Sequence, residues 1–270
     1  MSIKLYYQNA ECNFGDVLSK NIVSFISGKN VVWSPLKKAD LVAIGSLGER
    51  VALKKMKRFC LCFGRSLDVW GTGFLEPGGR VNQQFLNIHA LRGMYSKDRF
   101  GAVSVPLGDP GLLTPLVYPT LFEDKGSVVC LPHLHDMESV HWISKVVELY
   151  PNKKVVSLDL SSPVEKVVSA IAGADFIVST AMHPLIVAQS YQVPFVWLEG
   201  ESLHPGMRYK FEDYFSVFDK KPDSIQMKKL LSGISTVSDF TQASDSSIIP
   251  AQKIHSIQQN LIESFPGLYI

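Results

Sequence analysis

The chain has 270 residues, of which 46% are hydrophobic and 19% are charged, and its formal net charge is +2. This composition is ordinary for a soluble globular protein, and the length is sufficient for two modest α/β domains. So small a net charge gives no basic stripe of the kind that nucleic acid requires, and we expect no nucleic-acid partner.

The chain also lacks the sequence signals of secretion and membrane insertion. Residues 1–7 read as a strand rather than as a signal peptide. Cys60 and Cys62 lie in an apolar run, where buried free thiols are expected. No apolar run reaches the roughly 18 residues of a spanning helix. We therefore expect a cytoplasmic protein whose membrane contact, if any, is peripheral, on the inner face of the plasma membrane.

In the first half, apolar β-prone runs alternate with helical patterns. Strands are predicted over residues 3–7, 40–44, 59–63, 69–74 and 85–91, and helices over 16–26, over 49–57 and from 96. Asp16 is the expected N-cap of the first helix. Two prolines and a charged turn between 115 and 126 indicate a domain boundary, which divides the chain into 1–118 and 119–270.

The second half repeats the alternation of strands and helices. Strands are predicted over 127–131, 154–158, 176–178 and 194–198, and helices over 139–149, 162–172, 207–218, 224–231 and 250–265. Ser162 is the expected cap of the second of these helices, and 235–247 reads as a polar loop. After the strand at 176–178, Ser179 and Thr180 can cap a further helix, with Pro184 suited to its first position.

Strands that alternate with helices form parallel sheets covered on both faces. Two such halves predict an α/β fold with two Rossmann-like domains that face a cleft, as in two-lobed GT-B glycosyltransferases. The last helix is expected to cross back to the first domain. Ligands of such sheets bind at the carboxyl ends of the strands.

Polar residues follow the predicted strands at those ends. Asn13, Gly15 and Asp16 follow the first strand, where the glycine permits close backbone approach and the carboxylate can accept protons from sugar hydroxyls. A helix cap with a turn glycine is the alternative. Similar glycine turns hold Ser46, and Gly71, Thr72 and Gly73. None of them fits a dinucleotide fingerprint or a P-loop.

Several cationic side chains also follow strands. Arg92 can fork onto a carboxylate or phosphate, with a plain surface arginine as the alternative. Arg208 and Lys210 stand among aromatic residues after the last core strand, in what could equally be a solvated helix start. His133 and His135 are two residues apart with no third ligand evident nearby, so we expect no metal.

The strand, turn and helix pattern of residues 175–188 is the most informative feature of the chain. It sets His183 and the hydroxyls of Ser179 and Thr180 beside the free N–H groups of a helix start. Such a place suits a phosphate or a carboxylate. A packed or capping histidine is the alternative.

Taken in order, these motifs resemble the polysaccharide pyruvyl transferase family over about residues 3–215. The resemblance is carried by Asn13-Phe-Gly-Asp16-Val-Leu-Ser19, Gly71-Thr-Gly73, Leu91-Arg-Gly93 with Ser96, Leu107-Gly-Asp-Pro110, Ser179-Thr-Ala-Met-His183 with Ile186-Val-Ala188, and Lys210-Phe-Glu-Asp213. The chain departs from many members at Gly45-Ser-Leu-Gly48, where they have more glycines, and at Pro184, where they have a small residue.

The resemblance implies a transferase that uses phosphoenolpyruvate to place a pyruvate ketal on a sugar. The acceptor would be a bacterial surface polysaccharide, such as a capsule or exopolysaccharide, or its lipid-linked precursor. His183, Asp16 and Lys210 are the implied catalytic residues. The histidine would hold the phosphate or protonate the methylene carbon, and the aspartate would orient or deprotonate the acceptor. This scheme requires no cofactor and no metal.

The remaining implied residues bind substrate. They are Asn13, Gly15, Ser46, Gly71, Thr72, Gly73, Arg92, Ser179, Thr180 and Arg208. Two other functions stay open on the residues. One is a GT-B glycosyltransferase that uses a nucleotide sugar, because the same turns could hold a diphosphate. The other is a non-catalytic glycan-binding module of an envelope assembly complex.

Overall fold

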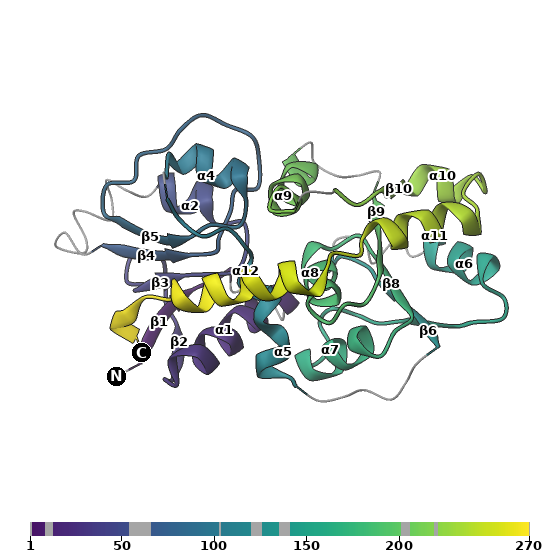
Figure 1. Ribbon diagram of the computed structural model, residues 1–270, viewed down its shortest axis with the longest axis horizontal. Coiled ribbons are helices and arrows are strands. Elements are labelled where there is room, and N and C mark those ends of the chain that lie inside the picture. The colour runs from purple at the N-terminus through teal and green to yellow at the C-terminus, as the bar shows by residue number, and fades with distance from the viewer. Residues whose placement is uncertain are drawn as a thin grey trace.

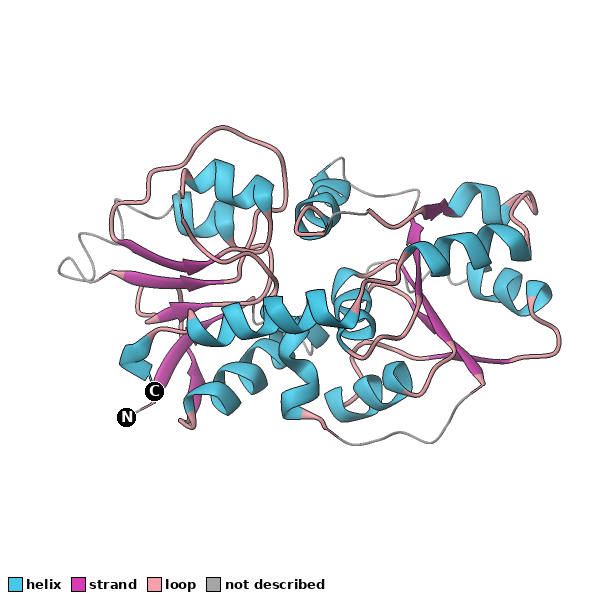
Figure 2. Cartoon of the chain, in the orientation of Figure 1, coloured by secondary structure: helices cyan, strands magenta, loops and turns pink. Residues whose placement is uncertain are grey.

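The computed structural model describes residues 2–8, 13–53, 66–102, 104–119, 126–134, 141–200, 206–218 and 221–269. The chain forms two lobes, each built on a parallel five-stranded sheet (Figures 1 and 2). The first lobe holds strands β1 to β5, and the second holds β6 to β10. The α/β fold with two Rossmann-like halves is therefore confirmed.

The first lobe follows the pattern of strand and helix in chain order. Its elements are β1 (Ile3–Tyr6), α1 (Phe14–Ser27), β2 (Val31–Trp33), β3 (Leu41–Val42), α2 (Gly48–Leu53), β4 (Leu67–Trp70), β5 (Leu86–Ala90) and α4 (Met94–Phe100). Two short turns of helix then lead to the second lobe: η1 (Pro110–Leu113) and α5 (Thr114–Val117). β1 pairs with both β2 and β3, and Leu5 lies opposite Leu41.

The second lobe repeats the pattern. Its elements are β6 (Ser127–Leu131), α6 (His141–Leu149), β7 (Lys154–Ser157), α7 (Val164–Ala172), β8 (Phe176–Ser179), α8 (Met182–Ser190), β9 (Phe195–Glu199), α9 (Gly206–Phe215), β10 (Ser224–Gln226), α10 (Met227–Leu231) and α11 (Val237–Ser246). The chain ends with α12 (Ala251–Glu263) and η3 (Gly267–Tyr269).

Both sheets have the same strand order. The first is β2-β1-β3-β4-β5, and the second, read from its other edge, is β7-β6-β8-β9-β10. In each sheet the second strand of the lobe lies on one side of the first, and the third strand lies on its other side. The direction in which strands are added to the sheet therefore reverses between the first and third strands. Ligands of open parallel sheets bind at such a switch point, outside the carboxyl ends of the strands. The topology therefore predicts two half-sites, one after β1 and β3 and the other after β6 and β8.

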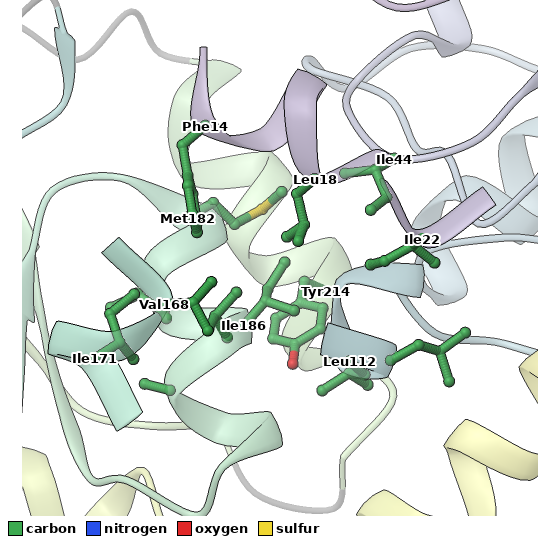
Figure 3. Close-up of a cluster of buried hydrophobic side chains, with 14 of the residues drawn as sticks. Phe14, Leu18, Ile22, Ile44, Leu112, Val168, Ile171, Met182, Ile186 and Tyr214 are labelled. Carbon is green, nitrogen blue, oxygen red and sulfur yellow. The ribbon is translucent and has the colours of Figure 1, made fainter. Parts of the chain in front are cut away.

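One hydrophobic core runs through both lobes. Phe14 and Leu18 of α1 belong to the same buried cluster as Met182 and Ile186 of α8 (Figure 3). The cluster continues into the strands of both sheets and into α12. Two further clusters cover the outer faces, one beneath α2 and α4 and the other beneath α6, α10 and α11.

The last helix crosses from the second lobe to the first, as expected (Figure 1). The indole N–H of Trp70 in β4 donates to the carbonyl of Leu261 at 3.0 Å. Beyond the helix, the Tyr269 hydroxyl donates to the Asp68 carboxylate at 2.6 Å. These contacts attach the end of the chain to the sheet of the first lobe.

Three predicted helix starts are wrong by a few residues. Asn13, not Asp16, caps α1, because its side chain accepts the N–H of Gly15. α7 is preceded by Pro163 rather than by a capping Ser162. α8 begins at Met182, so Pro184 occupies its third position and not its first.

The predicted polar loop at 235–247 is also wrong, since it contains α11. Thr236 and Asp239 form a capping box, in which each side chain accepts the other residue's backbone N–H. The short strands β2 and β10 were not predicted, and β10 occupies the start of the helix expected at 224–231. The strand expected at 59–63 lies outside the described residues.

Across the described ranges, no helix has both the length and the apolar character needed to cross a membrane.

Candidate active site

A cavity of about 170 Å³ lies over both switch points. Its first-lobe wall comes mainly from the segments after β1 and β3, and its second-lobe wall mainly from those after β6 and β8. Leu75 after β4, Leu160 after β7 and Lys210 of α9 complete the lining. The described lining residues are Gln8, Asn13, Phe14, Gly15, Asp16, Gly45, Ser46, Leu47, Leu75, His133, Leu134, Leu160, Ala181, Met182, His183, Pro184 and Lys210. The structure thus brings together Asn13, Gly15, Asp16, Ser46, His183 and Lys210 from the sequence-predicted set.

Two helix N-termini face this cavity. The first residues of α1 and those of α8 both line it. Backbone N–H groups without intrahelical partners give such ends a partial positive charge, which favours an anion. Pro184 has no N–H, so α8 offers fewer backbone donors than an ordinary helix start. Side chains must then supply more of the contacts to an anion on this wall.

His183 packs directly against the backbone of α1. A Cβ built on Gly15 would lie 2.3 Å from His183 Nδ1, closer than atoms can approach. Only glycine leaves room for the imidazole at this point of α1. The two helix ends therefore meet through a glycine and a histidine.

The His183 imidazole is neutral at physiological pH. Burial, together with the neighbouring charges of Lys210, Arg92 and His133, lowers its pKa to about 3. Its Nε2 atom is buried and has no hydrogen-bond partner among the described residues. A neutral imidazole of this kind can donate or accept one hydrogen bond to a ligand.

The pKa of Asp16 shifts in the opposite direction, and burial is again the cause. Burial raises its pKa to about 7, and a hydrogen bond from the backbone of Gln8 only partly opposes the change. Its Oδ2 atom is buried and has no partner in the described part of the chain. The carboxyl group therefore holds and releases a proton near neutral pH, as a general acid or base must.

Lys210 brings a cation to the cavity from α9. It is 9% exposed, and its Nζ lies 5.3 Å from the centroid of the Phe211 ring. Its charge also contributes to the low pKa of His183. Lys210, His183 and Asp16 therefore give the cavity a cation, a neutral imidazole and a carboxyl group that exchanges a proton.

Arg92 does not line the cavity but lies behind its wall. The side chain is fully buried and pairs with the Asp213 carboxylate of α9 at 2.9 Å. Its Nη1 donates to the Ser46 hydroxyl at 2.7 Å, and its Nη2 donates to the carbonyl of Phe74. All three contacts are with protein groups, so this guanidinium supports the wall.

The segment of Gly71, Thr72 and Gly73 shapes the same wall from behind. The Thr72 hydroxyl donates to the Gly45 carbonyl at 2.6 Å and accepts the N–H of Leu47 at 3.2 Å. A Cβ on Gly73 would lie 2.5 Å from the guanidinium carbon of Arg92. These residues hold the turn after β3 in place.

The hydroxyls of Ser179 and Thr180 are engaged within the second-lobe wall. Ser179 donates to the Leu131 carbonyl at 2.6 Å and accepts the N–H of Ala181 at 3.0 Å. Thr180 accepts the N–H of His133 at 2.8 Å. They connect the end of β8 to the end of β6, and neither lines the cavity.

Arg208 also lies off the cavity, although it is only two residues from Lys210. Its guanidinium pairs with Glu199 at 2.5 Å and with Glu212 at 3.0 Å, and the side chain is about half exposed. Residues one apart on a helix point in different directions, and those two apart nearly oppose each other. This spacing separates the two cations.

The sequence motifs did not single out Gln8 for the cavity, and they brought up His133 only as a metal ligand. Both come directly after a strand, β1 and β6 respectively, at the sheet edge where ligands bind. Their position just after a strand is the sequence signal that could have indicated both residues as part of the cavity. Among the residues that the structure describes, no three His, Cys, Asp or Glu side chains gather as a metal-binding group.

Comparison with known proteins identifies both a family and a fold. The family model described as "Polysaccharide pyruvyl transferase" matches residues 3–202. Among solved structures, the S. aureus MnaA-UDP co-structure has a TM-score of 0.52 at 11% identity, covering 95% of this chain and 94% of that one. E. coli ADP-heptose lps heptosyltransferase II has a TM-score of 0.41 at 11% identity, covering 97% and 99%. No curated protein matches the sequence. At such low identity the structural likeness concerns the fold, which is GT-B-like.

Proposed function

Because this chain belongs to the polysaccharide pyruvyl transferase family, we propose that it uses phosphoenolpyruvate to form a pyruvate ketal on a sugar. The acceptor would be a bacterial surface polysaccharide or its lipid-linked precursor. The observation that carries the proposal is the cavity, in which Lys210 and two helix N-termini accompany a carboxyl group that exchanges a proton near pH 7.

Phosphoenolpyruvate presents a phosphate and a carboxylate, and both need positive charge or N–H donors. Lys210 supplies a cation, and the first residues of α8 supply backbone donors, whereas at the start of α1 the N–H groups of Gly15 and Asp16 already donate to Asn13. The neutral imidazole of His183 would donate from Nε2, where it has no other partner among the described residues. We assign these groups to the donor.

The reaction begins when the methylene carbon of phosphoenolpyruvate takes a proton, which makes C2 electrophilic. At pH 7 His183 is neutral, because its pKa is lowered to about 3, whereas the pKa of Asp16 is raised to about 7 and its carboxyl group is protonated part of the time. We therefore assign proton donation to Asp16. The resulting carboxylate can then take the proton of the sugar hydroxyl that attacks C2. Attack by a second hydroxyl expels phosphate, which leaves with that hydroxyl's proton, and closes the ketal.

The direct test combines the protein with phosphoenolpyruvate and a panel of lipid-linked oligosaccharides. We expect release of inorganic phosphate together with an acceptor that has gained the mass of the ketal. His183→Ala should lower transfer strongly, while His255→Ala, an exposed histidine on α12, serves as the matched control. Transfer near the wild-type rate in His183→Ala would exclude the histidine from the reaction.

Two other outcomes would replace the proposal. The S. aureus MnaA structure of similar fold is a co-structure with UDP, so the cavity is also tested with nucleoside diphosphates. Protection from thermal unfolding by UDP, but not by phosphoenolpyruvate, would favour a nucleotide-sugar glycosyltransferase. Saturable glycan binding without phosphate release would favour a binding module.

A further inference from the structure

Helix α9 connects the two lobes through opposite faces. On the second-lobe side, the Phe211 ring stacks on Trp197 of β9, with centroids 4.5 Å apart. On the first-lobe side, α9 lies against the start of α4, where the N–H of Met94 donates to the Ser216 hydroxyl at 2.8 Å. The helix that carries Lys210 is thus held from both lobes.

Asp213 makes the central contact on the first-lobe side. Its Oδ1 accepts the N–H of Ser96 at 2.8 Å, and its Oδ2 accepts the Ser96 hydroxyl at 2.6 Å. α4 has no capping side chain of its own, because its N-cap residue is Gly93. A carboxylate from the other lobe therefore performs the N-cap role, where both the hydrogen bonds and the helix dipole favour it.

The same carboxylate is linked to both walls of the cavity. Asp213 pairs with Arg92, whose Nη1 donates to Ser46, a residue of the first-lobe wall. One helical turn before Asp213 stands Lys210, which lines the cavity from α9. The side chains of Arg92 and Asp213 are both fully buried, so loss of either one leaves the charge of the other uncompensated.

We propose that Asp213 is a positioning residue for Lys210. Its bonds to Arg92 and to the start of α4 fix α9 against the first lobe, and this fixes the place of the lysine in the cavity. We call the contacts of Asp213 with Arg92, Gly93 and Ser96 the latch. The placement of Lys210 is independent of the substrate, whereas the effect of the latch on donor binding rests on the proposed function.

Gly93→Ala disturbs the latch without removing any polar group. A Cβ at Gly93 would lie 1.7 Å from the Asp213 carbonyl oxygen, so α9 must move away. The backbone at Gly93 is extended, with φ −160°, so alanine adds no conformational strain. Gly79→Ala is the matched control, because a Cβ there meets nothing within 4 Å.

The first measurement is the rate at which Lys210 reacts with an amine-directed reagent, read by mass spectrometry. We expect the buried Lys210 to react several-fold faster in Gly93→Ala than in Gly79→Ala, while the exposed Lys228 reacts equally in both. Ser96→Ala, which removes one hydroxyl from the latch, should give a smaller change in the same direction. An unchanged rate at Lys210 in folded Gly93→Ala and Ser96→Ala would overturn the proposal.

The second measurement is the dissociation constant for phosphoenolpyruvate. Gly93→Ala should weaken binding by about tenfold to a hundredfold, as expected for a displaced contact residue. In a Lys210→Ala background the same change should have no further effect, because the latch acts through the lysine. An equal loss in both backgrounds would contradict the latch. If the wild type does not bind phosphoenolpyruvate, the proposed function fails while the labelling result still decides the latch.

Discussion

Burial shifts the pKa values of Asp16 and His183, which both line the cavity, in opposite directions, because it disfavours whichever form is charged. The pKa of Asp16 rises to about 7 and that of His183 falls to about 3. At neutral pH the cavity therefore holds the charge of Lys210, a neutral imidazole and a carboxyl group that is protonated part of the time. This state suits an anionic donor that must also receive a proton.

Asp16→Asn should remove the proton carrier. We expect kcat/KM for phosphoenolpyruvate to fall by about 10²–10⁴-fold, the usual contribution of a general acid or base. In the wild type the protonated form is lost as pH rises through about 7, so kcat/KM should decline above that pH. The pH–rate profile of the asparagine variant should lack this decline. A decline of the same shape in both proteins would assign it to another group.

The same substitution should stabilise the folded state at alkaline pH. The folded pKa of Asp16 lies above its ordinary value of 3.8, so between about pH 4 and 7 the native state holds a proton that the unfolded chain has released. The free energy of unfolding therefore falls as pH rises through this window. At pH 8 the asparagine variant should gain on the order of 2–4 kcal/mol, with no gain at pH 4. Thermal unfolding at the two pH values measures the difference.

At the scale of elements, the site depends on how two helices begin. The starts of α1 and α8 meet across the cavity, and Gly15 gives His183 the room to lie between them. The sequence motifs indicated both helix starts but misplaced their caps. Asn13 and Asp16 are both strong capping residues, and local preference alone does not choose between them. Only the fold shows that Asp16 is left to face the cavity.

Gly15→Ala should displace the histidine without unfolding α1, since alanine is the best helix former. A methyl group 2.3 Å from Nδ1 forces the imidazole away from its position. We expect transfer activity to fall by about a hundredfold, as a shift of about 1 Å can do. Circular dichroism should report an unchanged helix content. Gly79→Ala, where the methyl group meets no atom, should keep wild-type activity.

Helix α11 gives an element-scale prediction on stability alone. Thr236 and Asp239 satisfy each other's backbone N–H groups in a capping box, and neither residue lines the cavity. Thr236→Ala should lower the free energy of unfolding by about 1 kcal/mol. Transfer kinetics should not change. Chemical denaturation and a phosphate-release assay on the same preparation test both parts.

At the scale of the molecule, alternation of strands and helices was sufficient to predict two parallel sheets, and the analogy with two-lobed glycosyltransferases supplied the crossing last helix. It was not sufficient for the two shortest edge strands, β2 and β10, whose three residues each give too little periodicity. It also could not show that Arg92 is turned inward to Asp213, because the partner lies 121 residues away. Long-range pairing of this kind depends on the fold and leaves no local pattern.

Leu261→Ala tests whether α12 unites the lobes. Leu261 is fully buried in the core cluster that both lobes share, and its backbone carbonyl accepts the indole of Trp70. Loss of its side chain should cost about 2–5 kcal/mol. We expect one calorimetric transition, shifted as a whole. Two separate transitions, of which only one moves, would show that the lobes unfold independently. Gln259→Ala, on the exposed side of α12, is the control.

The shared core also limits how the enzyme can move. Phe14 and Leu18 of the first lobe and Met182 and Ile186 of the second belong to one buried cluster (Figure 3). A hinge motion that swung the lobes apart would expose these side chains to water, at about 25 cal/mol for each Å² of apolar surface. We therefore expect turnover without hinge opening. Donor and acceptor would then have to fit together into a cavity whose shape stays nearly constant through the reaction.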